Sequence, residues 1–358
     1  MGDLLAGGAP AAGAPAMRVL LVAGLDVSLP GGVETHVREL ARGLLARGHE
    51  VAILGRWSRP DADPAPPLVE SVEPGRHDVI HHHGGAWSRR WDAGDRYLRT
   101  FHFSVAAKMG VYLRMGRIRT LFNPGNHRAL ADERASLRRG RRHIAVSRAL
   151  RDELVRFHGA AREAIEVIPN GASFAAPREG RDGWRRRHGI DPGARLLLTI
   201  GRDDYVKGLD LLERAWPSAA ATTGNALWIQ VGGARAERRG DRIVTGPIPA
   251  GDVTEWIHAA DVGAFPSYYE GGGIALAEML AGGLYVLTHS VGAAPEAIRP
   301  RENGEFVPRR ADAWAAALAR TLAAPPRPAS PGLPPEWTWD QVVGRIETVY
   351  HRLLHPSA

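Results

Sequence analysis

Cysteine is absent from the sequence, so disulfide bonds, thiolate metal ligands and thiol nucleophiles are excluded. No stretch is apolar for the roughly 20 residues that a membrane-spanning helix needs. Residues 1–16 have neither a basic start nor a continuous apolar core, so they indicate a flexible tail rather than a signal peptide. We therefore expect a soluble, cytoplasmic protein.

Acidic residues are slightly fewer than basic ones, and the net charge is +7 with histidine neutral. A modest basic excess suits an anionic partner such as a nucleotide, a phosphorylated acceptor or a membrane surface. We do not expect a nucleic-acid partner, since no known basic and aromatic motif accompanies the charge. With 44% apolar residues, the 358-residue chain has the composition and length of a globular protein of two domains.

Short apolar segments alternate with helical patterns in two consecutive series. The first series opens with an apolar segment at 18–23, an amphipathic pattern at 33–45 and a second apolar segment at 51–54, which together form a βαβ unit. The other expected strands lie at 78–82, 144–147, 196–200, 227–231, 261–265 and 285–288. Two such series predict an α/β protein with two doubly wound, Rossmann-like domains.

The expected organisation is a tail at 1–16, an N-terminal domain at 17–175, a C-terminal domain at 176–337 and a final helix at 338–358. Residues 175–195, rich in Arg, Gly and Asp, are expected to link the domains. The final helix opens with a capping box at 338–341 and carries an apolar stripe formed by Val342, Ile346, Val349, Tyr350 and Leu353.

A glycine-rich stretch between two glutamates, 266–283, follows the expected strand at 261–265. The helix after the glycines begins with amide groups that lack an internal acceptor, and such a helix terminus favours a phosphate. Glu270 and Glu278 carry the wrong charge for a phosphate but are good acceptors for sugar or ribose hydroxyls. The stretch therefore indicates a site for a nucleotide sugar, and the alternative is a glycine turn with two solvated glutamates.

A second candidate lies after the strand at 196–200, where Gly201-Arg202 is followed by Lys207-Gly208. Two cations at such a junction would lie where a diphosphate binds. Charged loops are common at these positions, so an ordinary surface loop is the alternative. Asp203 and Asp204 add two acids to the same loop.

Three patterns that could suggest other chemistry are set aside. Adjacent residues on a strand point to opposite faces, so His81, His82 and His83 cannot all bind one metal ion. Asp61 and Asp63 fit the acidic motif of metal-dependent glycosyltransferases but lie in a proline-rich loop. No G-x-G-x-x-G follows the first strand, which disfavours a dehydrogenase. We expect no metal ion and no cofactor.

Residues 108–122 mix cations with large apolar side chains. On a helix, Val111, Met115, Ile118 and Phe122 would share one side, with Arg114 and Arg117 beside it. Such a stretch could rest on an anionic membrane, so a peripheral location on the inner membrane face is one reading. The alternatives are a core-facing helix or a cover over the pocket of a soluble acceptor, and the two glycines in the stretch favour these.

Four motifs, spread over residues 17–354, together resemble the GT-B retaining glycosyltransferases of family 4. They are Gly31-Gly32-Val33-Glu34, Ile168-Pro169-Asn170-Gly171, the pair Gly201-Arg202 and Lys207-Gly208, and the segment from Glu270 to Glu278. The resemblance implies the GT-B fold, with two Rossmann-like domains facing a central cleft and the final helix returning to the N-terminal domain.

The resemblance also implies roles for single residues. Glu270 would hold hydroxyls of the donor sugar, and Glu278 those of the ribose. Arg202 and Lys207 would neutralise the departing diphosphate, and His102 would lie near the transferred sugar. The remaining residues of the implied donor site are Gly31, Gly32, Gly201, Gly272, Gly273 and Ile274. Gly272 stands where the family often has a larger side chain, which leaves the donor open.

The implied reaction moves a sugar, with retention, from a nucleoside diphosphate sugar to a hydroxyl of a small-molecule, glycan or lipid-linked acceptor. A uridine donor is expected ahead of a guanosine one. No carboxylate is an obvious nucleophile, so a front-face displacement is expected rather than a covalent intermediate. The alternatives are a nucleotide-sugar epimerase of the same fold and a binding module without catalysis.

Overall fold

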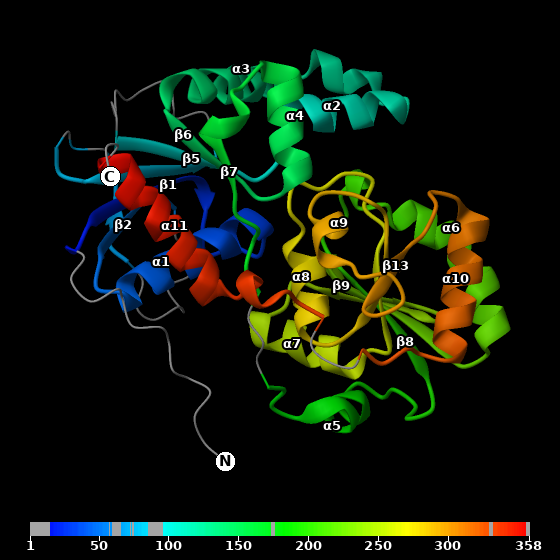
Figure 1. The fold of residues 1–358 in the computed structure, drawn as a ribbon. Coiled ribbons are helices and arrows are strands. Elements are labelled where there is room, and N and C mark those ends of the chain that lie inside the picture. Colours follow the sequence, from blue (N-terminus) through cyan, green and yellow to red (C-terminus); the bar gives the residue numbers. More distant parts are fainter. Residues whose placement is uncertain are drawn as a thin grey trace. The chain divides into compact units, whose positions relative to one another are not determined.

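The computed structural model describes residues 15–56, 58, 66–71, 73, 75–84, 96–172, 176–328 and 332–355 (Figure 1). The chain divides into two compact units. Unit 1 comprises Met1–Gly171 with Pro335–Ala358, and unit 2 comprises Ala172–Pro334. Residues 1–14 of the expected tail and the Asp61/Asp63 pattern lie outside the described residues.

Unit 1 contains a parallel sheet of seven strands in the order β3-β2-β1-β4-β5-β6-β7. The interior strand β1 pairs with β2 on one edge and β4 on the other, and it is buried from Val19 to Ala23. The strands are β1 (Arg18–Asp26), β2 (Glu50–Arg56), β3 (Leu68–Val69), β4 (Val79–Gly84), β5 (Tyr97–Phe101), β6 (Arg142–Ala145) and β7 (Ile165–Val167).

Helices lie between most of the parallel strands of unit 1 along the chain, as crossover connections of a parallel sheet require. In the first of them Val37, Leu40, Ala41 and Leu44 are buried, which confirms the predicted helical pattern. The helices are α1 (Gly32–Ala46), α2 (Val105–Arg114), α3 (Pro124–Arg139) and α4 (Arg148–His158), with 3-10 turns η2 (Ile118–Phe122) and η3 (Arg162–Ala164). Nowhere in the described chain is a helix both long and apolar enough to cross a bilayer.

Unit 2 contains a second sheet, of six strands in the order β10-β9-β8-β11-β12-β13. Its strands are β8 (Arg195–Ile200), β9 (Ala226–Arg239), β10 (Arg242–Gly246), β11 (Val262–Phe265), β12 (Tyr285–Thr288) and β13 (Gly304–Phe306). Its helices are α5 (Gly180–Arg187), η4 (Tyr205–Lys207), α6 (Leu209–Thr223), α7 (Ala250–Ala259), α8 (Ile274–Ala281), α9 (Ala294–Ala297) and α10 (Ala311–Ala323). Two sheets of this kind confirm the predicted pair of doubly wound α/β units.

Strands β8 and β11 are parallel neighbours in the unit 2 sheet, with Val262 opposite Leu197. Their carboxyl ends, at Ile200 and Phe265, therefore open onto the same edge of the sheet. Ligands of open parallel sheets bind at this edge. It carries the loops that hold most of the predicted donor-site residues.

The segment 175–195 is more than the link that its composition suggested. Within it, α5 packs on α7, and the buried Arg185 donates to Asp261 (2.9 Å) and to backbone carbonyls such as that of Ala259. Removing Arg185 would leave the buried Asp261 with less compensation for its charge. The segment expected to link the domains thus contributes one arginine, Arg185, to the core of unit 2.

The last helix, α11 (Trp339–Leu354), follows the 3-10 turn η5 (Pro335–Trp337) and packs against α1 in unit 1 (Figure 1). The Thr338 hydroxyl accepts from the amide of Gln341 (3.4 Å), which confirms the predicted cap, and all five residues of the predicted apolar stripe are buried. At its carboxyl half, the Tyr350 hydroxyl lies 2.7 Å from Nδ1 of His81 on β4.

Candidate functional site

In unit 2, the loop after β8 carries both predicted diphosphate cations. Arg202 is exposed just beyond the strand, and Lys207 is the last residue of η4. Asp204 accepts from the amide of Val206 (3.3 Å) and so caps η4, while Asp203 accepts from Gln230 (2.7 Å). The two acids that stand beside the cations in the sequence therefore have structural partners, one within the loop and one on β9.

The loop after β11 brings Glu270 to Lys207. The Lys207 ammonium donates to Oε1 of Glu270 at 2.6 Å, and the Ser267 hydroxyl donates to the same oxygen at 2.9 Å. Gly208, directly after Lys207, has φ +68°, and a Cβ there would lie 2.1 Å from the carbonyl oxygen of Pro266. Glycine at this position therefore permits the close approach that places the two side chains together.

The helix after the three glycines begins at Ile274, and Gly273 is its N-cap with φ +102°. No side chain caps this end, so the amide groups of its first turn point toward the loop without an internal acceptor. Gly272 is buried, and its carbonyl accepts from the amide of Ala293 (3.1 Å). The loop that carries the predicted phosphate-binding amides is thus anchored by a hydrogen bond from the segment after β12.

The support for this glycine loop comes from residues 291–294, which the sequence reasoning missed. Gly292 has φ +51°, and a Cβ on it would lie 3.0 Å from both the carbonyl oxygen and the Cβ of Glu270. A larger residue would therefore push against the backbone of the glutamate itself. The sequence signal that could have found it is a second glycine turn, four residues after the end of β12.

Glu278 lies one turn into α8 and is half-buried. Gly201 follows β8 directly, at the carboxyl edge shared with β11. Unit 2 thus brings Lys207 and Glu270 into direct contact and places Arg202, Gly201 and the start of α8 on the loops of the same sheet edge. Their assigned roles toward a donor remain predictions.

In unit 1, Gly31 is the N-cap of α1 and Gly32 is its first residue. No side chain caps the helix, and the Glu34 carboxylate turns back toward Gly31, where a Cβ would lie 2.1 Å from its Oε2. The predicted glycine loop is therefore the start of a helix, and no side chain caps the first amides of that helix. Its proposed approach to a donor remains a prediction.

His102 directly follows β5 and lies in a cluster with two other histidines of unit 1. Its ring is 4.8 Å from that of His36 on α1 and 5.5 Å from that of His83 on β4, measured between centroids. Nδ1 of His83 lies 3.3 Å from Nε2 of His102. Burial lowers the pKa of His83 and His102 well below the usual value and that of His36 to about 4, so all three rings are neutral at pH 7.

The alternation argued for the three consecutive histidines is confirmed. His81 and His83 share one face of β4, with ring centroids 4.1 Å apart, while His82 lies beside Tyr97. His83 also meets histidines from other parts of the chain, which its position on a strand did not predict. The sequence offered little signal for this meeting, because His36 lies within the helix after β1 and no strand was predicted in front of His102.

The motif Ile168-Pro169-Asn170-Gly171 also reaches this cluster. Oδ1 of Asn170 lies 2.9 Å from Nδ1 of His36, and both residues are buried. A Cβ on Gly171 would lie 2.6 Å from the Trp339 ring, so this residue allows the start of α11 to pack closely. The motif therefore orients a histidine, a role that the sequence did not reveal.

The prediction of one helix through 108–122 is wrong. Helix α2 ends at Arg114, Gly116 has φ +73°, and the chain continues in the 3-10 turn η2. A glycine in the left-handed region beyond the last helical residue is a usual helix terminator. As a result, Val111 is 6% exposed in the core whereas Ile118 is 61% and Phe122 78% exposed.

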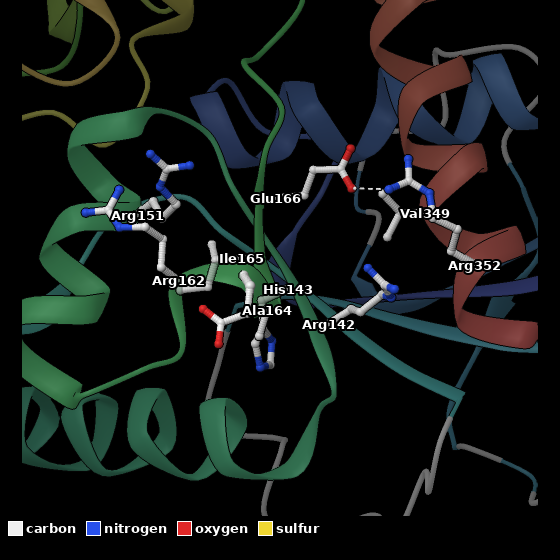
Figure 2. Close-up of a pocket in the computed structure, with 10 residues that line it drawn as sticks. Arg142, His143, Arg151, Arg162, Ala164, Ile165, Glu166, Val349 and Arg352 are labelled. Atoms are coloured by element: carbon white, nitrogen blue, oxygen red, sulfur yellow. Dashed lines mark hydrogen bonds and ion pairs between the residues drawn. The ribbon is translucent and has the colours of Figure 1, made fainter. Parts of the chain in front are cut away.

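A basic cavity of about 370 Å³ lies elsewhere in unit 1, where β6 and β7 begin (Figure 2). Arg142, Arg151, Arg162 and Arg352 line it, and Arg352 pairs with Glu166 at 3.2 Å. It opens at the amino ends of these strands, whereas ligands of such sheets bind at the carboxyl ends. None of the predicted site residues lines it, so we do not assign it to the site.

Two family profiles match the chain. The profile described as glycosyl transferases group 1 matches residues 194–324. The profile described as glycosyltransferase family 4 matches residues 30–76 and 63–175. Together they span most of both units.

Curated relatives match over most of their length. An uncharacterized glycosyltransferase of Methanocaldococcus jannaschii is 26% identical over 344 residues, covering 82% of this chain and 85% of the relative. A D-inositol 3-phosphate glycosyltransferase of Acidothermus cellulolyticus is 26% identical over 400 residues, covering 90% of this chain and 86% of the relative.

Solved structures share the fold. Sucrose-phosphate synthase from Thermosynechococcus elongatus superposes with a TM-score of 0.75 at 20% identity, covering 95% of this chain and 100% of that one. HepE from Anabaena, in complex with UDP and glucose, gives a TM-score of 0.71 at 16% identity, covering 94% and 99%. From the profile matches, the relatives and this fold, we conclude that the chain belongs to the glycosyl transferases group 1, family 4, and is a glycosyltransferase of the GT-B fold.

Proposed function

We propose that the enzyme transfers a sugar from a nucleoside diphosphate sugar, with UDP preferred over GDP, to an acceptor hydroxyl and with retention of configuration. The observation that carries this proposal is the contact between Lys207 and Glu270 beside the uncapped start of α8. It sets a cation, a hydroxyl acceptor and unpaired amides at one edge of one sheet. The structures of HepE with UDP and with UDP-glucose support a uridine donor.

In this proposal the donor diphosphate binds beside Lys207, Arg202 and the first amides of α8. Charge builds on the diphosphate as the glycosidic bond breaks, and cations and amides that are already in place stabilise that charge. Glu270 binds sugar hydroxyls through its carboxylate, and Glu278 binds the ribose. Folding already fixes the orientation of Glu270, because the Ser267 hydroxyl donates to its carboxylate and Gly292 lies close against its backbone.

His102 of unit 1 is the proposed residue beside the transferred sugar. Because its imidazole is neutral, it can either donate to or accept from a sugar hydroxyl. Retention would follow from front-face displacement, in which a departing phosphate oxygen takes the proton of the attacking hydroxyl. This route needs no nucleophile from the protein.

The acceptor is a small molecule, a glycan or a lipid-linked molecule. The relatives named D-inositol 3-phosphate glycosyltransferase favour a phosphorylated small molecule, which also fits the net charge of +7. A thermal-shift screen of nucleoside diphosphates and their sugars selects the donor. Donor consumption is then measured with a panel of acceptors that includes D-inositol 3-phosphate.

Donor consumption with and without acceptor tests the proposal. A transferase consumes donor in step with an added acceptor, an epimerase converts donor without any acceptor, and a binding module leaves it unchanged. Proton NMR of the product's anomeric position reports whether configuration is retained. Acceptor-independent conversion to an epimer would reject the proposed reaction.

Metal independence is the first consequence for transfer. Lys207, Arg202 and the α8 amides supply the charge that a divalent ion supplies in other glycosyltransferases, so we expect EDTA to leave initial rates undiminished. Rates are compared in EDTA, in Mg²⁺ and in Mn²⁺. Activity that EDTA abolishes and Mg²⁺ or Mn²⁺ restores would show that the acidic pattern at 61–63 binds a catalytic metal.

We further propose that η2 touches an anionic membrane when the acceptor is lipid-linked. Ile118, Leu121 and Phe122 are exposed apolar residues, and Phe103 is also exposed. Arginines 114, 117 and 119 flank them, and each cation near an anionic surface contributes about 1 kcal/mol. The break at Gly116 supports this reading, because it leaves Ile118 and Phe122 outside the core.

Flotation with vesicles that contain anionic lipid tests the membrane contact. Wild type is expected to float at low salt and less at high salt, and both Arg114→Glu/Arg117→Glu and Ile118→Ser/Phe122→Ser are expected to remain at the bottom. The matched control is Arg235→Glu/Arg238→Glu, which changes the charge equally at exposed arginines of unit 2. If wild type does not float at low salt, the membrane contact is rejected and a soluble acceptor is favoured.

A further inference from the structure

The histidine cluster of unit 1 has the composition of a metal-binding site. His36, His83 and His102 come from α1, β4 and the loop after β5, and one ring nitrogen of each lies within 4.8 Å of the others. Three parts of the chain that are distant in sequence thus each bring an imidazole nitrogen to the same place.

Two of these rings each have a buried nitrogen that makes no hydrogen bond among the described residues. Oδ1 of Asn170 can only accept, so Nδ1 of His36 carries the proton and its Nε2 carries the lone pair. That Nε2 is buried, and so is Nε2 of His83; neither has a hydrogen-bond partner among the described residues. A buried polar atom without a partner is costly, and a bound ion would remove that cost.

The contact between Asn170 and His36 is also the arrangement found around metal-bound histidines. Such a histidine usually donates its other ring N–H to an oxygen, which fixes both its tautomer and its orientation. His81 shows the contrast within the same cluster. Its two nitrogens lie 2.7 Å from the hydroxyls of Tyr350 and Thr100, so it packs on His83 without being available as a ligand.

The ligand set selects the class of ion. Neutral imidazoles suit Zn²⁺, Co²⁺, Ni²⁺ and Cu²⁺, whereas Mg²⁺ and Ca²⁺ require oxygen ligands. Zn–N bonds of 2.0–2.1 Å place tetrahedral nitrogens about 3.3 Å apart, so the rings would need to close by about 1.5 Å or less. His102 is only partly buried, which leaves an entry path and a fourth position for water.

We propose that His36, His83 and His102 bind one divalent transition-metal ion of the Zn²⁺ class, and that the bound ion inhibits sugar transfer. Inhibition follows because the ion occupies the lone pair of His102 and places a positive charge beside the proposed sugar position. This second part rests on the proposed function, whereas the binding itself does not. The ion is a regulator here, and transfer proceeds without it.

Binding is measured with Co²⁺ and Zn²⁺ alone on protein purified without a histidine tag. Because the chain has no cysteine, the visible absorption of four-coordinate Co²⁺ reports nitrogen and oxygen ligands only. We expect one Co²⁺ per chain, displaced by Zn²⁺ and unaffected by excess Mg²⁺. Loss of a ligand or of Asn170 should weaken the affinity at least about tenfold.

The variants are His36→Ala, His102→Ala and Asn170→Ala, with the exposed His127→Ala as the matched control. If the variants at the buried residues His36 and Asn170 fail to fold, His102→Ala still tests metal binding, because the His102 side chain is partly exposed. No saturable one-to-one signal from wild type would overturn the proposal. So would unchanged affinity in His102→Ala, or equal weakening in His127→Ala.

Inhibition is measured separately, as the initial rate of donor consumption against Zn²⁺ concentration. The rate should fall in parallel with occupancy and recover on addition of EDTA. A protein that binds Zn²⁺ at these residues and keeps its full rate would overturn the inhibitory part and also the proposed role of His102. Binding without any transferase activity would reject the proposed function while leaving the metal site established.

Discussion

Replacing Glu270 by glutamine is expected to lower turnover by about 100-fold or more, the effect usual for removing one strong transition-state contact. The variant keeps the shape of the side chain but removes the charge that accepts from Lys207 and Ser267. Hydroxyl groups of a donor sugar would then meet a weaker acceptor. The fold should remain intact, because Glu270 is held by loop contacts rather than by the core.

Affinity for the nucleoside diphosphate separates this effect from general damage. In Glu270→Gln the Lys207 ammonium loses its carboxylate partner, so we expect diphosphate affinity to be retained or increased while turnover falls. Glu237→Gln is the matched control, since Glu237 pairs with Arg239 at 2.8 Å elsewhere in unit 2. Near-wild-type turnover in Glu270→Gln would remove the assigned role of this residue.

Replacing Lys207 by alanine is expected to weaken binding of the free nucleoside diphosphate by about 10- to 150-fold. This range corresponds to about 1.5–3 kcal/mol for one charge-assisted hydrogen bond. The side chain of Lys207 is 28% exposed, so its charge is only partly screened by water. Arg202→Ala should act in the same direction with a smaller effect, because Arg202 is exposed.

Isothermal titration with the nucleoside diphosphate measures both variants. Arg214→Ala serves as the matched control, since Arg214 is an exposed cation of α6 that pairs with Asp210 at 2.9 Å. Its affinity should equal that of wild type. Unchanged affinity in both Lys207→Ala and Arg202→Ala would contradict the assignment of the diphosphate position.

Local patterns predicted much of the fold because they depend on neighbours in the chain. The apolar segments at 18–23 and 196–200 lie within β1 and β8, and the capping box at Thr338 begins α11. Both loops of the donor site could be placed for the same reason, since each directly follows a recognisable strand. What remained hidden was the direct contact between Lys207 and Glu270, which are 63 positions apart.

Long-range contacts and single glycines account for the rest. His36 and Asn170 are 134 positions apart, and no periodicity in the sequence relates them. In 108–122, the helical spacing was correct up to Arg114, and the left-handed backbone at Gly116 then changed which apolar residues are buried. Arg185 could not be told from its exposed neighbours, because its burial depends on Asp261, which directly precedes β11, a strand that comes later in the chain.

Unit 1 is assembled from two separate stretches of chain, and this fixes the order in which it can form during synthesis. Its sheet is translated first, but α11 is translated only after all of unit 2. Until then the surface that receives α11 is uncovered, including Gly43, which packs against Val343, and the Nδ1 of His81 that meets Tyr350. The nascent chain therefore carries an incomplete first unit while the second one folds, and in that interval the exposed face of α1 is open to chaperones and to aggregation.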